Sequence, residues 1–237
     1  MYTSSRNFPP QLVSFSGIDG AGKSTQISNL RAHLASLGFH VRILSFWDDA
    51  AVLKTLREGA SHKIFKSEVG IGSPERPVQR RDKNVRSPLM TLFRFALYLL
   101  DGLSLRRVAR RALASGADVI VFDRYLFDEL ANLNLRNPLS RLYLRLLLML
   151  VPHPSVAFIL DADPAQARAR KPEYPLEFLD VNRRAYLRIA ELAGYFVVIP
   201  PLPPEAVRAH MIEALSQRIL TRRQSSAPAP IVEATQS

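Results

Sequence analysis

The run Gly17-Ile18-Asp19-Gly20-Ala21-Gly22-Lys23-Ser24 has the composition and spacing of a phosphate-binding loop. Glycines at these positions let main-chain N–H groups point at the oxygens of a polyphosphate, next to the positive end of a helix. Lys23 would place a positive charge on the β- and γ-phosphates, and the Ser24 hydroxyl would be a ligand of Mg²⁺. The alternative interpretation of the same residues is a Gly-rich surface turn.

The segments on either side of this loop favour the phosphate site. Leu12–Phe15 is a short apolar run typical of a strand, and Lys23–Leu37 carries apolar residues at helical spacing. A strand that ends in a glycine loop and opens a helix is the context that the motif needs. We therefore predict that the chain binds a nucleoside triphosphate. The predicted contacts are Gly17, Ile18, Asp19, Gly20, Ala21, Gly22, Lys23, Ser24 and Thr25.

A second polar pair follows another apolar run. Val119–Phe122 reads as a buried strand, and Asp123 and Arg124 come directly after it. Ligands collect at the carboxyl ends of strands in open α/β sheets. Asp123 could hold magnesium there, directly or through water, and Arg124 could clamp a phosphate with its planar fork. A structural Asp–Arg pair is the alternative, and the phosphate-binding loop favours the functional interpretation.

Apolar strand runs alternate with helical patterns along the chain, which is typical of βαβ units and a parallel sheet. The predicted strands are Leu12–Phe15, Val41–Phe46, Val119–Phe122, Val156–Leu160 and Tyr195–Ile199. The predicted helices are Lys23–Leu37, Ala50–Glu58, Pro88–Ser115, Asp128–Leu135, Pro138–Val151, Pro164–Arg170, Leu176–Ala193 and Pro204–Leu220. We expect a three-layer α/β/α fold of the P-loop NTPase type, with a five-stranded parallel sheet.

Composition narrows the class of protein. The chain has 237 residues, of which 47% are hydrophobic and 22% charged, as in ordinary globular proteins. It has no cysteine, which excludes disulfides and thiolate metal sites and fits a cytoplasmic protein. The apolar runs are too short to cross a membrane. The net charge of +11 permits polyanion binding or a kinase with two anionic substrates, and without a basic block interleaved with aromatics we do not expect a nucleic-acid partner.

The motifs together resemble bacterial thymidylate kinases, in their order and spacing, over residues 12 to 200. The specific matches are Phe15, the loop of residues 17–24 with Thr25 and Gln26, the run Asp123-Arg124-Tyr125, and Ala131. Softer matches are the run Leu160-Asp161-Ala162-Asp163-Pro164, Arg170, Phe178 and Tyr186-Leu187.

The resemblance implies an enzyme that moves the γ-phosphate of ATP to dTMP with Mg²⁺. Lys23 and Ser24 would serve the phosphates and the metal, and Asp19 would face the 3′-hydroxyl of the acceptor sugar. Asp123 would orient magnesium or the acceptor, and Arg124 would bind the acceptor phosphate.

The resemblance also implies an acceptor-base site and a mobile lid. Phe93 occupies the position whose ring stacks on the acceptor base, although plain helix core is an equal alternative. Some relatives place an arginine inside the loop at Gly20 or Ala21, so here a catalytic arginine must come from elsewhere. Arg168 and Arg170, with Lys171, lie in the expected lid at about 168–176 and could supply it, unless they are ordinary solvated charges.

The sequence departs from the family on the acceptor side. After the second strand, an arginine-bearing segment is replaced by residues 45–51, which contain Trp47, Asp48 and Asp49. The two carboxylates would repel an acceptor phosphate, unless they cap the next helix. A base-reading arginine is expected where Leu97 stands. Asp128 stands where a serine is expected, and Asn132 where an aromatic residue is expected.

Three hypotheses therefore stay open: a dTMP kinase, a related kinase for another small acceptor, and an ATP-binding regulatory protein with little transfer activity. The predicted acceptor contacts are Asp19, Phe93, Arg94, Arg124 and Asp128, and Trp47 and Asn132 would also set specificity for another acceptor. We expect one kinase domain over residues 1–220, with a long basic loop at 59–87 and a disordered tail at 221–237. By analogy with relatives, the apolar helices at 88–100 and 142–151 would form a homodimer.

Overall fold

The computed structural model describes residues 9–52 and 88–226, and these residues form one five-stranded parallel sheet in the order β2-β3-β1-β4-β5. The strands are β1 (Gln11–Ser16), β2 (Val41–Ser45), β3 (Val119–Asp123), β4 (Val156–Leu160) and β5 (Phe196–Ile199). β1 lies at the centre of the sheet, between β3 and β4. The loop that follows β1 therefore starts at the central strand of the sheet.

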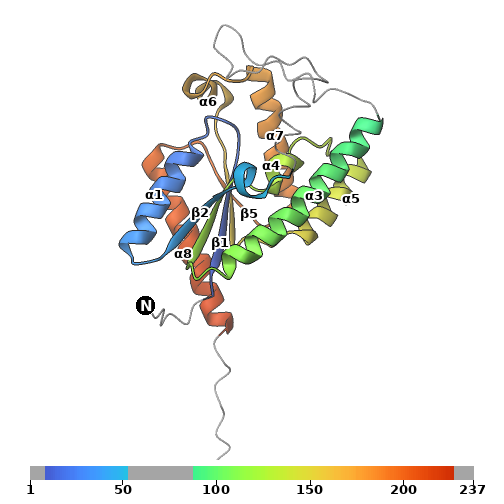
Figure 1. Ribbon diagram of the computed structural model, residues 1–237. Helices are drawn as coiled ribbons and strands as arrows, with labels where there is room; N and C mark the ends of the chain where they lie inside the picture. The colour runs from blue at the N-terminus through green and yellow to red at the C-terminus, as the bar shows by residue number, and fades with distance from the viewer. Residues whose placement is uncertain (1–8, 53–87, 227–237) are drawn as a thin grey trace, which may run out of the picture.

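Helices cover both faces of the sheet, which confirms the predicted three-layer α/β/α fold (Figure 1). α1 (Lys23–Ser36) and α8 (Pro204–Ser226) pack together on one face. The other face carries α3 (Pro88–Leu113), α4 (Leu126–Leu130), α5 (Pro138–Leu150) and α7 (Leu176–Ala193). The short α6 (Pro164–Arg170) lies beyond the carboxyl end of β4. None of the described helices is long and apolar enough to cross a membrane.

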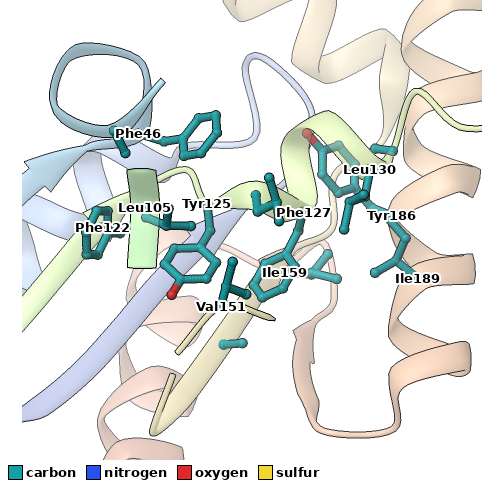
Figure 2. Close-up of a cluster of buried hydrophobic side chains, with 14 of the residues drawn as sticks. Phe46, Leu105, Phe122, Tyr125, Phe127, Leu130, Val151, Ile159, Tyr186 and Ile189 are labelled. Atoms are coloured by element: carbon teal, nitrogen blue, oxygen red, sulfur yellow. The ribbon is translucent and has the colours of Figure 1, made fainter. Parts of the chain in front are cut away.

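The three inner strands β1, β3 and β4 are buried along almost their whole length because both faces of the sheet are covered. Side chains alternate between the faces, so Ile120 and Phe122 join the core under α3, α4, α5 and α7, while Val119 and Val121 join the core under α1 and α8. Figure 2 shows part of the first core, where Tyr125 and Tyr186 bring hydroxyl groups into an otherwise apolar cluster. The two cores hold the carboxyl ends of β1 and β3 side by side.

Two predicted helices were placed wrongly. The helix predicted at Asp128–Leu135 is α4, which covers Leu126–Leu130, because the Asp128 carboxylate accepts a hydrogen bond from the Tyr125 N–H at 3.1 Å and starts the helix earlier. The helix predicted at Ala50–Glu58 is replaced, at its start, by the π-helical turn η1 (Phe46–Ala50), and its remainder extends into residues outside the described ranges.

Other boundaries differ slightly. α8 continues through Ser226, so the first residues of the predicted tail are helical, since no proline interrupts the chain before Pro228. The rest of that tail, 227–237, lies outside the described residues, as does the predicted basic loop at 59–87.

Candidate active site

The loop between β1 and α1 lies in close contact with the main chain of Leu160 and Ala167, and this contact explains why two of its positions are glycine. A Cβ on Gly17 would lie 2.5 Å from the carbonyl oxygen of Leu160, and one on Gly20 would overlap the carbonyl oxygen of Ala167. Both glycines also have positive φ, 139° and 83°. Side chains are therefore excluded from this part of the loop, and the main chain itself forms the surface that a polyphosphate would meet.

The loop passes directly into the first turn of α1. Gly22 is the N-cap of α1 in the left-handed region, and the side chains of Ser24 and Thr25 in the first turn are exposed. The unpaired N–H groups at a helix start attract anions. The glycine cradle and this helix start therefore fit the phosphates of ATP.

Lys23 is buried and directed back over the loop. Its Nζ donates hydrogen bonds to the carbonyl oxygens of Gly17 at 2.8 Å and Ile18 at 2.9 Å. Burial, and after it the nearby positive charge of Arg124, lower the pKa of Lys23 to about 8. A phosphate anion at this position would favour the charged form again, so the protonation of Lys23 should depend on the ligand.

Asp123 lies at the same edge of the sheet as the loop. The β1–β3 register pairs Asp123 with Phe15, two residues before Gly17, and the side chain is half-buried. A carboxylate here and the exposed Ser24 hydroxyl are the hard oxygen ligands that Mg²⁺ prefers. Among the described residues, no group of three or more acidic, His or Cys side chains is arranged so that it could hold a metal ion. That donor set fits an ion held mainly by phosphates and water rather than by a protein cage.

Arg124 has an uncommon backbone conformation and two carboxylate partners. It is the one non-glycine residue in the described ranges with a positive φ, 66°, and its N–H bonds to the Phe15 carbonyl at 2.9 Å. Its guanidinium bonds to Asp19 in the loop and to Asp128 in α4, the latter at 3.0 Å. Burial opposes the charge of Arg124, but Asp128 and Asp19 outweigh burial and raise its pKa.

Asp128 is buried behind Arg124 rather than open to the solvent side of the site. Its side chain is 1% exposed, and its carboxylate accepts hydrogen bonds from the Ser16 hydroxyl at 2.7 Å and the Tyr186 hydroxyl at 2.8 Å. Burial, and then the charge of Asp128, raise the pKa of Tyr186 well above its ordinary value. Sequence reasoning found Asp128 but missed its contacts with Ser16 and Tyr186.

The predicted lid approaches the loop through α6 and the residue after it. The Nη1 atom of Arg170 lies 4.0 Å from the position that a Cβ on Gly22 would take. Lys171 Nζ lies 3.9 Å from an Asp19 carboxylate oxygen and 3.3 Å from Glu173. Arg168 is two positions before Arg170, about 200° around the helix. The structure therefore brings Arg170 to the loop, and Arg168 starts from a different side of the same helix.

The predicted acceptor-base residues lie on α3 and η1. Phe93 is 46% exposed, so the alternative of plain helix core is wrong for this ring. Trp47 is 36% exposed and packs edge-on against Phe46. Leu97, which stands in place of the expected arginine, packs against the core. Asp49 accepts a hydrogen bond from the Ser45 N–H at 2.7 Å, so its carboxylate bonds back toward β2 and not forward to cap a following helix, as the alternative interpretation had expected.

Sequence reasoning missed a polar group beside these residues. The Tyr98 hydroxyl hydrogen-bonds with Glu129 and Asn132, and Arg94 lies close enough to affect its ionisation. Burial is the main cause of the raised pKa of Tyr98, and Glu129 adds to it. Glu129 is only 5% exposed. The feature of the sequence that could have revealed this group is Glu129, a second carboxylate directly after Asp128 in an otherwise apolar helix.

Comparison with known proteins gives one consistent group of relatives. The chain is 30% identical over 225 residues to a thymidylate kinase from Dinoroseobacter shibae, covering 88% of this chain and 97% of that protein. It is 27% identical over 222 residues to a probable thymidylate kinase from Archaeoglobus fulgidus, covering 91% and 100%.

A solved structure of a thymidylate kinase has the same fold. A crystal structure of a thymidylate kinase from Ehrlichia chaffeensis superposes with a TM-score of 0.54 and 18% identity, covering 87% of this chain and 98% of that one. No family profile matches the chain.

Proposed function

The chain belongs to the thymidylate kinase family of ATP-dependent nucleoside monophosphate kinases, and on this premise we propose that it transfers the γ-phosphate of ATP to dTMP. One observation carries the proposal. Arg124, from the strand beside β1, reaches Asp19 inside the phosphate-binding loop. The phosphate-binding loop after β1 and the arginine directly after β3 thus meet at one edge of the sheet, as transfer between two bound phosphates requires.

Different residues would bind the donor nucleotide and the acceptor phosphate. The main-chain N–H groups of the loop bind the donor phosphates, and Lys23 neutralises their charge. Ser24 and Asp123 would hold Mg²⁺, which supplies further positive charge on the phosphates when bound. Arg124 orients the acceptor phosphate with its planar fork.

Transfer makes one bond and breaks one. An oxygen of the acceptor phosphate attacks the γ-phosphorus in line, and the bond from that phosphorus to the bridging oxygen of ADP breaks. Negative charge spreads over the transferred group, and Arg170, which lies next to Gly22, would stabilise it. α6 lies against Gly20 on one side of the loop, and this cover would help to keep water from the reacting oxygens.

A kinase for a different small acceptor is the second candidate function, and the residues on the acceptor side favour it. Leu97 cannot donate a hydrogen bond to a base, and Glu129 places a buried carboxylate beside Arg94 and Tyr98. Such a change of donors and acceptors alters discrimination between bases by several kcal/mol. Phe93 and Arg94 are the proposed base contacts in either case.

An assay with ATP, Mg²⁺ and a panel of nucleoside monophosphates tests the proposal. Formation of dTDP supports a dTMP kinase, and turnover of another acceptor supports the second candidate. ATP binding without acceptor-dependent ADP release would instead mean a regulatory nucleotide-binding protein. Lys23→Ala should abolish the activity, and activity that survived this change would come from a contaminant or a misassigned site.

We also propose that the protein forms a homodimer through α3 and α5. These helices pack against each other and carry large exposed apolar side chains. The exposed residues are Leu92, Leu99, Leu100 and Leu103 on α3, and Leu139, Leu142, Leu146 and Met149 on α5. A second copy of the chain would remove this apolar surface from water.

A further inference from the structure

The carboxylate of Asp128 is fully occupied by groups from three parts of the chain. One oxygen accepts from the Ser16 hydroxyl at the end of β1 and from the Tyr125 N–H, at 2.7 and 3.1 Å. The other accepts from Arg124 Nη1 and from the Tyr186 hydroxyl on α7, at 3.0 and 2.8 Å. With a side chain 1% exposed, Asp128 has no open face for a substrate.

Arg124 needs partners of this kind to hold a defined position. Its positive φ is unfavourable for a side-chain-bearing residue, and its long side chain has several rotatable bonds. The guanidinium lies between two carboxylates that differ in exposure, because the side chain of Asp19 is 19% exposed and that of Asp128 is 1% exposed. An incoming phosphate can therefore compete with Asp19 for Arg124, while the buried bond to Asp128 stays in place.

All four hydrogen-bond donors to Asp128 restrain its carboxylate in one position. A buried carboxylate with all its hydrogen bonds made is rigid, and its charge keeps the guanidinium from turning away. Ser16 and Tyr186 donate their hydroxyl hydrogen bonds to Asp128 and not to Arg124, so through these bonds they hold the carboxylate that holds the arginine. Tyr186 thereby joins α7, which follows the lid, to the residue that binds the acceptor.

We infer that Asp128 is a positioning residue that fixes the Arg124 guanidinium at the phosphate-binding loop for the phosphate of the acceptor, and that Tyr186 in turn holds Asp128. This inference rests on the proposed function for the identity of that phosphate. It replaces the expectation that Asp128 contacts the acceptor directly.

Steady-state kinetics of Asp128→Asn test this role. The isosteric amide presents a donor or a neutral oxygen to Arg124, so the KM for the acceptor should rise at least about tenfold, while the KM for ATP stays within about twofold. Tyr186→Phe keeps the carboxylate and should give a smaller rise of the same kind. A matched control is Asp180→Asn, since Asp180 likewise pairs with an arginine four residues away, Arg184 at 2.6 Å, but on an exposed face. This control should behave as wild type.

A second measurement does not depend on turnover. NMR of protein labelled with ¹⁵N-arginine reports how fast each guanidinium rotates, and Arg124→Lys assigns the Arg124 signal. In wild type and in Asp180→Asn this guanidinium should rotate slowly, and in Asp128→Asn, where only the more exposed Asp19 still holds it, it should rotate measurably faster.

The two measurements separate the inference from the proposed function. A wild-type protein that phosphorylates no nucleoside monophosphate would refute the function alone, and NMR would still decide on Asp128. An Arg124 guanidinium as immobile in Asp128→Asn as in wild type would overturn the inference. So would an Asp128→Asn enzyme whose acceptor KM is unchanged.

Discussion

The guanidinium of Arg124 bonds to the carboxylate of Asp19 and so joins the ends of β3 and β1 across the phosphate-binding loop. The residue proposed to bind the acceptor phosphate and the residue expected to face the acceptor sugar thus hold each other. Burial would raise the pKa of Asp19, but Arg124, Lys23 and Lys171 outweigh burial and lower it below its ordinary 3.8.

The lowered pKa predicts how Asp19 contributes to stability in acid. The folded protein binds the Asp19 proton less readily than the unfolded chain does, so the contribution is complete at pH values above about 4 to 5 and is lost as the pH falls through the folded pKa. Urea unfolding of wild type and Asp19→Asn should give a constant difference in unfolding free energy from pH 7 to 5. That difference should shrink below pH 4, and a difference that grew in acid would contradict the ion pair.

Gly20 provides a test of the contact between the loop and α6. Gly20→Ala should lower the free energy of unfolding by about 2–4 kcal/mol and cut kcat, because the new Cβ overlaps the Ala167 carbonyl and φ is positive. Gly116→Ala is the control, since Gly116 has a similar φ of 82° but no atom within 4 Å of its Cβ position. It should cost only the backbone strain, about 1 kcal/mol. Equal losses in the two variants would mean that α6 does not press on the loop.

Lys23 should take up a proton when ATP binds near its pKa of about 8. Polyphosphate beside the amine favours the charged form, so binding at pH 8 should take up about half a proton, and binding at pH 6 almost none. Calorimetry in two buffers of different ionisation enthalpy measures this number. In Lys23→Arg the side chain stays charged at all these pH values, and the uptake at pH 8 should disappear. Persistence of the uptake in that variant would assign the proton to another group.

The sequence was sufficient for the scaffold because its signals are local. The strands are mostly apolar, the glycine loop specifies its own backbone, and β4, α6 and α7 have the predicted bounds. Gly38, Gly116 and Gly194, which follow α1, α3 and α7, all have positive φ, as glycines that end helices commonly do. The Asp128 network could not be predicted in the same way, because Ser16 and Tyr186 are 112 and 58 residues away and meet Asp128 only through the strand order.

Hydrogen bonds from side chains to the nearby main chain explain why two elements were predicted at the wrong positions. Asp128 has an acidic side chain that can bond to the main chain as well as sit inside a helix, and its bond to Tyr125 moved the start of α4. In the same way, Asp49 bonds back to Ser45 and closes a turn directly after β2, where the pattern had indicated more strand.

The two predicted lid arginines should differ in their contributions to catalysis. Arg170→Ala should lower kcat by about 100-fold or more, because its guanidinium lies beside Gly22 where the transferred phosphate develops charge. Arg168→Ala, on the same helix but about 200° away, should lower kcat by less than about fivefold. The KM for ATP should change little in either variant if the contact forms mainly in the transition state. The reverse order of the two effects would place Arg168 at the phosphates.

The exposed face of α5 predicts the assembly of the protein. Leu139, Leu142, Leu146 and Met149 recur every three or four residues, which places them on one side of the helix, and they are 50–70% exposed. Leu142→Glu with Leu146→Glu puts two charges into the proposed contact between copies and should convert a dimer of about twice 26.6 kDa into a monomer. Light scattering after gel filtration measures the mass. Arg31→Glu, on the exposed side of α1 on the other face of the sheet, changes the net charge by the same amount and controls for added negative charge. A wild-type protein that is monomeric at all concentrations would refute the dimer. So would a double leucine variant that stays dimeric.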